Sequence, residues 1–247
     1  MGGAAPGEAR LSAVRADLLV LVPARGGSKR LPGKNLRPLA GRSLLAHTAE
    51  AIAASGLAAP VLLTTDDAAI AAEGQRIGWQ VPFLRPAALA GDAAPTVGAV
   101  LHALDWWRAT HGADPAAVMV LQPTSPLRGG ACLRRAVALL DEHPLHDSVV
   151  AVDALHVAAG HVYVPTSDGG MAPLAGTDGR RPVYVPNGAL YLTRVAALRR
   201  DETLYAGPIL PLPLAPPRGL DVDTEDDWFM ADALIAALAA RPAGSAP

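Results

Sequence analysis

The chain has 247 residues, enough for one large α/β domain or for one domain with a small insertion. Hydrophobic residues make up 51% of it and aromatic residues only 4%, so Ala, Val and Leu must fill the core, as in helices layered on a buried sheet. The net charge of −2 disfavours a broad basic surface for nucleic acid, and one cysteine, Cys132, excludes an internal disulfide and a cysteine-based zinc cluster.

The two ends of the chain are expected to lie outside the folded unit. Residues 1–16 are rich in Gly and Ala and predict a disordered extension, followed by one domain at 17–241 and a tail at 242–247. No stretch approaches the roughly 18 uninterrupted apolar residues of a membrane span. The first apolar run, residues 18–22, is too short for the core of a signal peptide. We therefore expect a cytoplasmic protein that does not bind membranes.

The first half of the chain alternates short apolar runs with amphipathic segments. Strands are predicted at residues 18–22, 61–65, 81–84 and 118–121. Helices are predicted at residues 43–56, 67–78, 96–111 and 129–142. Ser43 and Thr96 are the expected N-caps of two of these helices. Strands that alternate with helices through short connections predict an α/β fold with an open, mostly parallel, Rossmann-like sheet, covered by helices on both faces.

The pattern changes after the strand-like run 148–152. Residues 153–182 contain Gly, Pro, Asp and strand-like pieces, such as 161–164, but no clear helix. They predict a small β-rich insertion. The core pattern resumes at residues 183–193, and a helix at 224–240, with Thr224 as its expected N-cap, closes the domain.

The loop after the first predicted strand carries the strongest functional signal. Its sequence, PARGGSKRLPGKN, follows a buried strand at the edge where open parallel sheets bind ligands. Gly26, Gly27 and Gly33 let backbone N–H groups approach an anion, and the loop adds four positive charges: Arg25, Lys29, Arg30 and Lys34. A solvated basic loop is the alternative, but the segment favours a site for polyphosphate.

This loop is neither of the two best-known phosphate-binding loops. In a Walker loop Ser or Thr follows the Gly-Lys pair, whereas Asn35 follows Lys34 here. The dinucleotide fingerprint fails as well, because Ser28 stands at the position of its second glycine.

The segment ARGGSKRLPGKN instead resembles the signature of the acylneuraminate cytidylyltransferases, which make the CMP forms of sialic acid and other nonulosonic acids. The related CMP-Kdo synthetases usually continue with Pro, so Asn35 favours the sialic-type branch. The resemblance implies the fold of the nucleotide-diphospho-sugar transferases and a homodimer formed through the insertion. It also implies a nucleotidyltransferase that converts CTP and an acidic 2-keto sugar to CMP-sugar and pyrophosphate.

The resemblance also implies roles for residues of the loop. Arg25 and Lys34 would bind the CTP phosphates, Lys34 would stabilise charge in the transition state, and Asn35 would contact the nucleotide or the loop backbone. The implied nucleotide-binding residues are Ala24, Gly26, Gly27, Ser28, Arg85 and Thr96. Arg85 and Thr96 flank a stretch similar to the family loop over the cytosine, for which an ordinary connecting loop is the alternative.

Two further motifs imply a site for the acceptor sugar. The segment LQPTSPLR matches a family signature in which Gln122 points into the sugar site, while Thr124, Ser125 and Arg128 shape the turn from strand to helix. A rigid turn without chemistry is the alternative for Ser125 and Arg128. The segment NGALYL matches the strand that borders the acceptor, which adds Asn187 and Tyr191.

The chain departs from its relatives beside this strand. They commonly carry Arg before the Pro-Asn-Gly, where this chain has Val185. A bound carboxylate needs a cation or several N–H donors, so we expect Arg181 or Arg180 to meet it; solvated loop arginines are the alternative. Two other hypotheses stay open: a CMP-transferase for another acid, such as Kdo or a phosphonate, and a non-catalytic nucleotide-binding module.

The last motif is LDVDT, in which Asp221 and Asp223 lie two residues apart. In an extended segment this spacing puts both carboxylates on one side, where they can reach one ion. Two carboxylates, completed by phosphate oxygens and water, suit Mg²⁺, which the family holds with this pair. Capping of the next helix is the alternative. For Asp66 and Asp67, ligand groups and a helix cap are both possible.

Overall fold

The computed structural model describes residues 17–91, 94–155, 161–167, 170–173 and 183–240. The predicted extension at 1–16, the tail at 242–247, and Arg180 and Arg181 lie outside these residues. Within them, no helix combines the length and the apolar character needed to cross a membrane.

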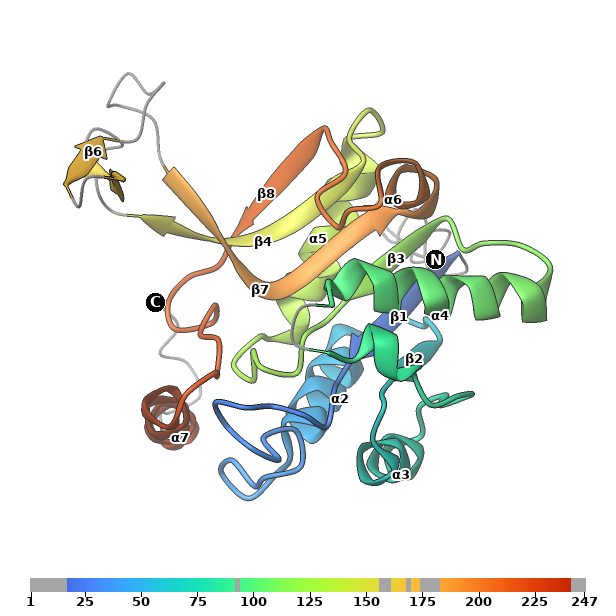
Figure 1. The fold of residues 1–247 in the computed structure, drawn as a ribbon, viewed down its shortest axis with the longest axis horizontal. Coiled ribbons are helices and arrows are strands. Elements are labelled where there is room, and N and C mark those ends of the chain that lie inside the picture. Colours follow the sequence, from blue (N-terminus) through green and yellow to red (C-terminus); the bar gives the residue numbers. More distant parts are fainter. Residues whose placement is uncertain (1–16, 92–93, 156–160, 168–169, 174–182, 241–247) are drawn as a thin grey trace, which may run out of the picture.

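A six-stranded sheet forms the centre of the molecule, in the order β2-β1-β3-β7-β4-β8 (Figure 1). Its strands are β1 (Leu18–Pro23), β2 (Val61–Thr64), β3 (Ala117–Val120), β4 (Ser148–Leu155), β7 (Val183–Arg194) and β8 (Ile209–Pro213). β7 is antiparallel to its neighbours β3 and β4, and the other pairings are parallel. The predicted open, mostly parallel sheet is confirmed.

Helices cover both faces of this sheet. They are α2 (Leu44–Ser55), α3 (Ala68–Ile77), α4 (Thr96–His111), α5 (Gly130–Glu142) and α6 (Val195–Asp201); a further helix, α7 (Glu225–Ala239), lies elsewhere. α2, α3 and α5 share one apolar core with the sheet, and α4 and α6 share another. β1 supplies both cores, because Leu18, Val20 and Val22 belong to the first while Leu19 and Leu21 belong to the second. The sheet is therefore buried on both sides.

α7 packs on the loop after β1 and lies away from the sheet (Figure 1). Leu31 of this loop is fully buried in a third apolar cluster with Val222 and Trp228. Arg37 lies 4.5 Å from the centre of the Trp228 ring and pairs with Glu225 at 2.7 Å. These contacts fix the Asp-Val-Asp segment against the basic loop, although the two segments are far apart in the sequence.

Two helix starts follow the prediction and one does not. Ser43 accepts a hydrogen bond from the Ala46 N–H at 3.1 Å, and Thr224 forms a capping box with Asp227. The prediction that Thr96 is an N-cap is wrong: Pro95 occupies that position, and Thr96 is the first helical residue. The Thr96 side chain lines a cavity instead.

The predicted strand at 81–84 is also wrong. Only two isolated bridges form here: Gln80, just before the segment, pairs with Leu62 of β2, and Leu84 pairs with Thr65, just after β2. Pro82 has no N–H to donate to a ladder, and Leu84 is 54% exposed, so neither hydrogen bonding nor burial supports a continuous strand.

The insertion forms a small antiparallel hairpin of β5 (Tyr163–Pro165) and β6 (Met171–Pro173). It extends from the far ends of β4 and β7, away from the helices (Figure 1). For the described part of residues 153–182, the predicted β-rich character is confirmed.

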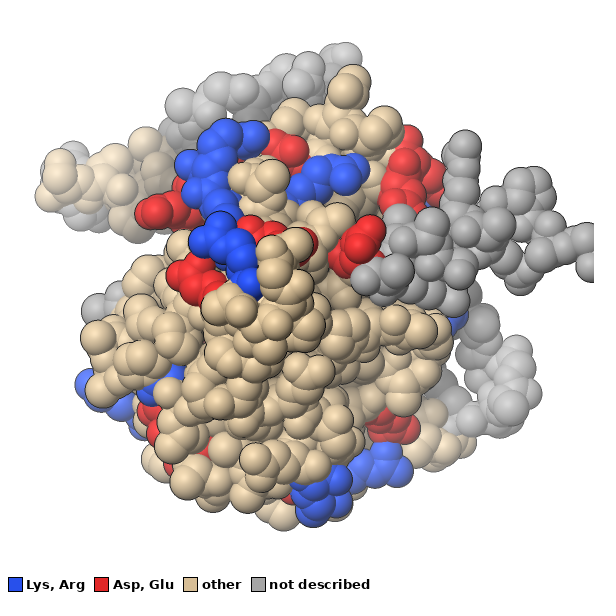
Figure 2. Space-filling view, turned by 90° about the vertical axis from the view of Figure 1, so that its right-hand side faces the viewer, with Lys and Arg blue, Asp and Glu red and all other residues tan. Residues whose placement is uncertain are grey.

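On the side of the molecule opposite the hairpin, ion pairs join helices to one another. Figure 2 shows basic and acidic side chains next to each other at the top of the face opposite the hairpin, above a broad uncharged area. Arg199 of α6 pairs at 2.8 Å with Asp105 of α4 and at 2.8 Å with Asp114 beyond it. These ion pairs hold α6 against the end of α4.

Candidate active site

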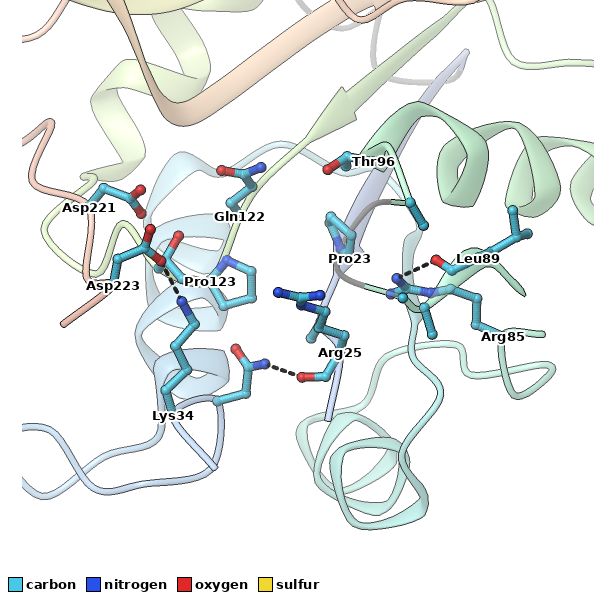
Figure 3. Close-up of a pocket in the computed structure, with 16 residues that line it drawn as sticks. Pro23, Arg25, Lys34, Arg85, Leu89, Thr96, Gln122, Pro123, Asp221 and Asp223 are labelled. Atoms are coloured by element: carbon cyan, nitrogen blue, oxygen red, sulfur yellow. Dashed lines mark hydrogen bonds and ion pairs between the residues drawn. The ribbon is translucent and has the colours of Figure 1, made fainter. Parts of the chain in front are cut away.

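A cavity of about 370 Å³ lies at the carboxyl ends of β1 and β3. These neighbouring strands are parallel, so the loops that follow them meet at one edge of the sheet. Nine of the predicted site residues line the cavity: Ala24, Arg25, Lys34, Asn35, Arg85, Thr96, Gln122, Asp221 and Asp223. In Figure 3 the two aspartates and Lys34 lie at one end, Arg85 and Leu89 at the other, and Arg25 and Gln122 between them. The cavity therefore has an ionic end with carboxylates and cations.

The rest of the wall is mostly small or apolar. It consists of Pro23, Leu89, Ala90, Gly91, Ala94, Pro123 and Thr124. Apolar walls with a few polar groups are typical of sites that bind part of a ligand by shape. Pro123 and Thr124 belong to the LQPTSPLR motif, and Leu89, Ala90, Gly91 and Ala94 to the stretch after Arg85, so most of this wall comes from segments that the sequence singles out.

Lys34 and Arg30 both contact Asp223. The Lys34 ammonium lies 2.7 Å from Asp223 Oδ1 and donates to the Val222 carbonyl at 3.2 Å. The Arg30 guanidinium lies 2.5 Å from Asp223 Oδ2. The basic loop and the acidic motif thus form one ionic cluster, which the sequence spacing did not predict.

Asn35 acts on the loop backbone. It is 5% exposed, and its Nδ2 donates to the Arg25 carbonyl at 2.9 Å. Figure 3 shows the Arg25 side chain pointing from this fixed backbone into the cavity. Of the two predicted contacts for Asn35, the structure contains the one to the backbone.

Gly26 is required for close packing at the start of the loop. Its N–H donates to Asp66 Oδ1 at 3.1 Å, and a methyl group there would lie 2.6 Å from Asp67 Oδ2. Asp67 in turn caps α3 by accepting from the N–H groups of Ala69 and Ile70, at 2.7 and 3.0 Å. The open question about Asp66 and Asp67 is thereby answered, since one anchors the loop and the other caps a helix.

Gly26, Gly27 and Ser28 are not part of the cavity lining. Ser28 donates its backbone N–H to the Gly26 carbonyl at 3.0 Å, which folds this part of the loop into a tight turn. Their contacts with a nucleotide remain predictions.

Arg85 joins two walls of the cavity. Only 8% exposed, it donates to the Thr64 carbonyl at 2.5 Å and to the Leu89 carbonyl at 3.5 Å. Burial lowers the pKa of its guanidinium, and the charge of Asp66 acts in the opposite direction. Its structural bonds tie the end of β2 to the apolar wall, while its predicted contact with the base remains a prediction.

The Asp221 carboxylate is poised for a cation. Its Oδ1 is buried and has no hydrogen-bond partner among the residues that the structure describes. Burial raises the pKa of this carboxyl; the Thr124 hydroxyl acts against the rise, and the charge of Asp223 adds to it. A buried, unpartnered carboxylate oxygen destabilises the fold unless a cation or donor meets it.

The residues present fit Mg²⁺. Asp221 and Asp223 offer hard oxygen ligands on one side of the cavity, and the described chain has no group of three His, Cys, Asp or Glu that could enclose an ion. Mg²⁺ usually binds one or two carboxylates and completes its shell with phosphate oxygens and water. Asp221 and Asp223 would hold such an ion at the ionic end of the cavity.

One prediction follows from the raised pKa of Asp221. The native state holds this proton more strongly than the unfolded chain does, so the stability from this group is lost as the pH rises above about 3.9, the ordinary aspartate value. Without metal, we expect the melting temperature of Asp221→Asn to lie a few degrees above that of the wild type at pH 8, and the difference to be smaller at pH 4. Thermal unfolding in EDTA across this range measures the difference. A difference that shrinks with rising pH would contradict the raised pKa of Asp221.

The acceptor motif Asn187-Gly188 adjoins the cavity at Gln122. Gly188 has a φ of +78°, and a methyl group on it would lie 2.5 Å from Gln122 Oε1. Asn187 is fixed in orientation, because its Oδ1 accepts from the Ala189 N–H at 3.1 Å and its Nδ2 donates to Asp153 Oδ1 at 3.0 Å. Asn187 does not line the cavity itself, so its contact with an acceptor remains a prediction.

Asp153 is a polar residue of this region that the sequence reasoning missed. A methyl group on Gly219 would lie 2.2 Å from its Oδ1, so the chain just before Asp221 passes directly over the Asp153–Asn187 pair. A signal existed: like Gln122, Asp153 comes directly after an apolar strand run.

Tyr191 lies on β7 beside Val120, the last residue of β3. It is 7% exposed and does not line the cavity, and its hydroxyl is 3.3 Å from that of Tyr205. Burial raises the pKa of Tyr191, and the charges of Tyr205 and Asp221 add to the rise. The hydroxyl is therefore neutral, and its role toward an acceptor remains a prediction.

Arg128 shapes the turn after β3, as expected. It is 2% exposed and donates to the carbonyls of Gln122 at 3.0 Å and Ala189 at 2.5 Å, and to Thr48 Oγ1 at 3.1 Å. Burial lowers its pKa to about 10. This arginine positions Gln122 from behind.

Val185 provides no cation at the acceptor strand. It pairs with Asp153 across β4 and β7 and is 44% exposed. The predicted replacements, Arg180 and Arg181, fall outside the described residues, so the contact of Arg181 with the acceptor stays a prediction.

Comparison with known proteins agrees with this geometry. Residues 19–143 match the cytidylyltransferase family model. The chain is 32% identical over 225 residues to the CMP-N,N'-diacetyllegionaminic acid synthase of Legionella pneumophila, covering 88% of this chain and 96% of that protein. It is 29% identical over 220 residues to an N-acylneuraminate cytidylyltransferase of Streptococcus agalactiae, covering 85% of this chain and 51% of that protein, so it spans about half of that relative.

The fold has a solved counterpart. The structure of CMP:2-keto-3-deoxy-manno-octonic acid synthetase complexed with CTP matches with a TM-score of 0.69 at 17% identity, over 90% of this chain and 99% of that one. At this identity the likeness establishes the fold alone. The family match covers the basic loop and the turn after β3, and the Legionella relative aligns over most of the chain. The chain therefore belongs to the cytidylyltransferases and, within them, to the acylneuraminate cytidylyltransferase family of CTP-dependent nucleotidyltransferases.

Proposed function

We propose that this cytidylyltransferase transfers CMP from CTP to an acidic 2-keto sugar of the nonulosonic type, with release of pyrophosphate. One observation carries the proposal: the cavity is lined by the cations Arg25 and Lys34, by Gln122 and by a carboxylate pair, one oxygen of which has no hydrogen-bond partner among the described residues. The alignment with the CMP-N,N'-diacetyllegionaminic acid synthase over most of both chains supports this class of acceptor.

The chemistry requires no covalent intermediate with the protein. The anomeric hydroxyl oxygen of the acceptor forms a bond to the α-phosphorus of CTP and releases its proton to water. The bond from that phosphorus to the bridging oxygen breaks, so that pyrophosphate leaves. Lys34 and Arg25 stabilise negative charge on the phosphates, and the fixed loop holds the triphosphate in line. Mg²⁺ at Asp221 and Asp223 would neutralise phosphate charge and orient the triphosphate.

Gln122 and the Asn187 region are the proposed acceptor side of the site. Arg128 fixes the backbone of the first and Asp153 the amide of the second, so both can offer hydrogen bonds in a defined direction. The cation for the acceptor carboxylate is proposed to be Arg181 or Arg180.

A panel of acceptors tests the proposal. Pyrophosphate release from CTP is measured with several nonulosonic acids, with Kdo and with a phosphonate, and each product is identified by mass spectrometry. We expect the highest kcat/KM with a nonulosonic acid. Faster turnover of Kdo or the phosphonate would assign the other acceptor, and CTP binding without turnover of any acid would favour a non-catalytic module.

A homodimer formed through the hairpin is part of the proposal, together with a cytoplasmic location, where CTP is made. Tyr163, Val164 and Met171 are 52%, 42% and 75% exposed on a two-stranded sheet, which is marginally stable alone. We expect light scattering to show a dimer, and Met171→Asp to convert it to a folded monomer. The matched control is Leu145→Asp, at an 85% exposed position outside the hairpin. A wild-type monomer, or a Met171→Asp dimer, would contradict the proposal.

A further inference from the structure

The two aspartates of the cavity differ in their ion pairs and hydrogen bonds. Both oxygens of Asp223 are engaged, Oδ1 by Lys34 at 2.7 Å and Oδ2 by Arg30 at 2.5 Å. Asp221 Oδ1 has no hydrogen-bond partner within the described residues. One carboxylate is therefore available to a metal ion, while the other is neutralised by two cations.

In this arrangement a triphosphate and a divalent metal ion each need one side of the same ion pairs. A triphosphate in the cavity needs the cations of the basic loop, and a divalent ion at the aspartate pair needs the negative charge of Asp223. While Lys34 and Arg30 stay on Asp223, a metal ion there meets two like charges at close range. While Asp223 holds these cations, it competes with the phosphates for them.

The backbone is built so that side chains alone can make the exchange. Leu31, directly after Arg30, is fully buried in one cluster with Val222, directly before Asp223. This contact keeps the two segments together whichever ion pairs form. The Arg30 side chain is 69% exposed and that of Asp223 is 30% exposed, so both have room to reorient.

We propose that Asp223 is an exchange partner, which holds Lys34 and Arg30 in the free enzyme and passes them to the triphosphate as it turns to the metal ion. The inference rests on the proposed function, because it takes CTP and a divalent cation as the ligands of this cavity. It assigns a role to Arg30, which is outside the cavity lining: Arg30 opposes metal binding until a nucleotide is present. It also makes Asp223 an inhibitor of nucleotide binding whenever metal is absent.

Metal-free binding of CTP tests the exchange most sharply. Isothermal titration of CTP in EDTA at pH 8 is compared for the wild type, Asp223→Asn and Asp221→Asn. We expect Asp223→Asn to bind CTP about tenfold more tightly, because Lys34 and Arg30 are released to the phosphates. Asp221→Asn measures general charge repulsion, since it removes a neighbouring cavity carboxylate that, among the described residues, forms no ion pair with Lys34 or Arg30; it should tighten binding clearly less than Asp223→Asn does.

Metal binding without nucleotide provides the second readout. Mn²⁺ binding, followed by electron paramagnetic resonance, should be about fivefold tighter in Arg30→Ala than in the wild type. Arg42→Ala is its control, because it also removes one exposed cation and uncovers one carboxylate, Glu50, and neither residue lines the cavity. It should leave Mn²⁺ affinity nearly unchanged.

The outcomes separate this inference from the proposed function. Equal CTP affinities for all three proteins in EDTA, with normal turnover of the wild type, would overturn the exchange and leave the function standing. A failure of every protein to bind CTP would overturn both. Tighter binding by Asp223→Asn and Asp221→Asn alike would also overturn the exchange, because general charge repulsion would then explain it.

Discussion

Replacing Asp221 with Asn should lower kcat/KM for CMP transfer at least about a thousandfold, since metal stabilisation of charge supplies several kcal/mol and each 1.36 kcal/mol is a factor of ten. The reason is local. The Asp221 oxygen that meets no donor among the described residues is the proposed ligand atom for the ion, and an amide in its place has no negative charge. Steady-state kinetics at saturating Mg²⁺ measure the effect.

The control for this variant is Asp226→Asn, in the exposed first turn of α7 and outside the cavity lining. It should keep activity within about twofold, as surface substitutions usually do. If Asp221→Asn retained most of its activity with normal metal dependence, the aspartate pair would be structural. Combined with the higher melting temperature expected without metal, a loss of activity would mean that this site gives up stability for function.

Lys34→Met should lower kcat by about a hundred- to a thousandfold, the usual loss when one preorganised charge-stabilising group is removed. Lys34 is the most shielded cation of the ionic cluster, with a side chain 13% exposed against 69% for Arg30. Charges interact more strongly where water is excluded, so this position cannot be replaced by a solvated cation. Rates at saturating CTP and acceptor distinguish a loss of catalysis from a loss of affinity.

The chain's other lysine, Lys29, is the matched control. It belongs to the same loop but is exposed and does not line the cavity. Lys29→Met should lower kcat/KM for CTP by less than about tenfold, mainly through a higher KM for CTP. Equal losses for the two variants would show that the loop acts through its overall charge.

Local motifs made much of this site predictable. The loop with Lys34 and Asn35 and the Gln122 turn each combine a strand end with a distinctive residue pattern, and the aspartate pair is a pattern just before α7; all three meet at one cavity. For the first two this works because parallel strands deliver their carboxyl ends to the same edge of a sheet, so order in the sequence becomes nearness in space.

Contacts between distant segments could not be predicted in this way. Arg30 and Asp223 are 193 positions apart, and only the packing of α7 on the loop after β1 joins them. Edge strand β8 was missed because it contains Pro211 and Pro213, which sequence patterns count against a strand although an edge tolerates them. Thr96 was wrongly predicted as an N-cap because threonine is common at that position, whereas Pro95 occupies it here.

The most direct test of the account is a crystal structure of the protein with CTP and Mn²⁺, using the anomalous signal of manganese. We propose that the cavity after β1 and β3 holds the triphosphate, with its metal ion on Asp221 and Asp223. We expect an anomalous peak within about 2.0–2.4 Å of oxygens from these carboxylates and from the phosphates, with Lys34 turned to the phosphates. A nucleotide in the cavity whose metal ion contacts neither aspartate, or a nucleotide bound elsewhere, would contradict it.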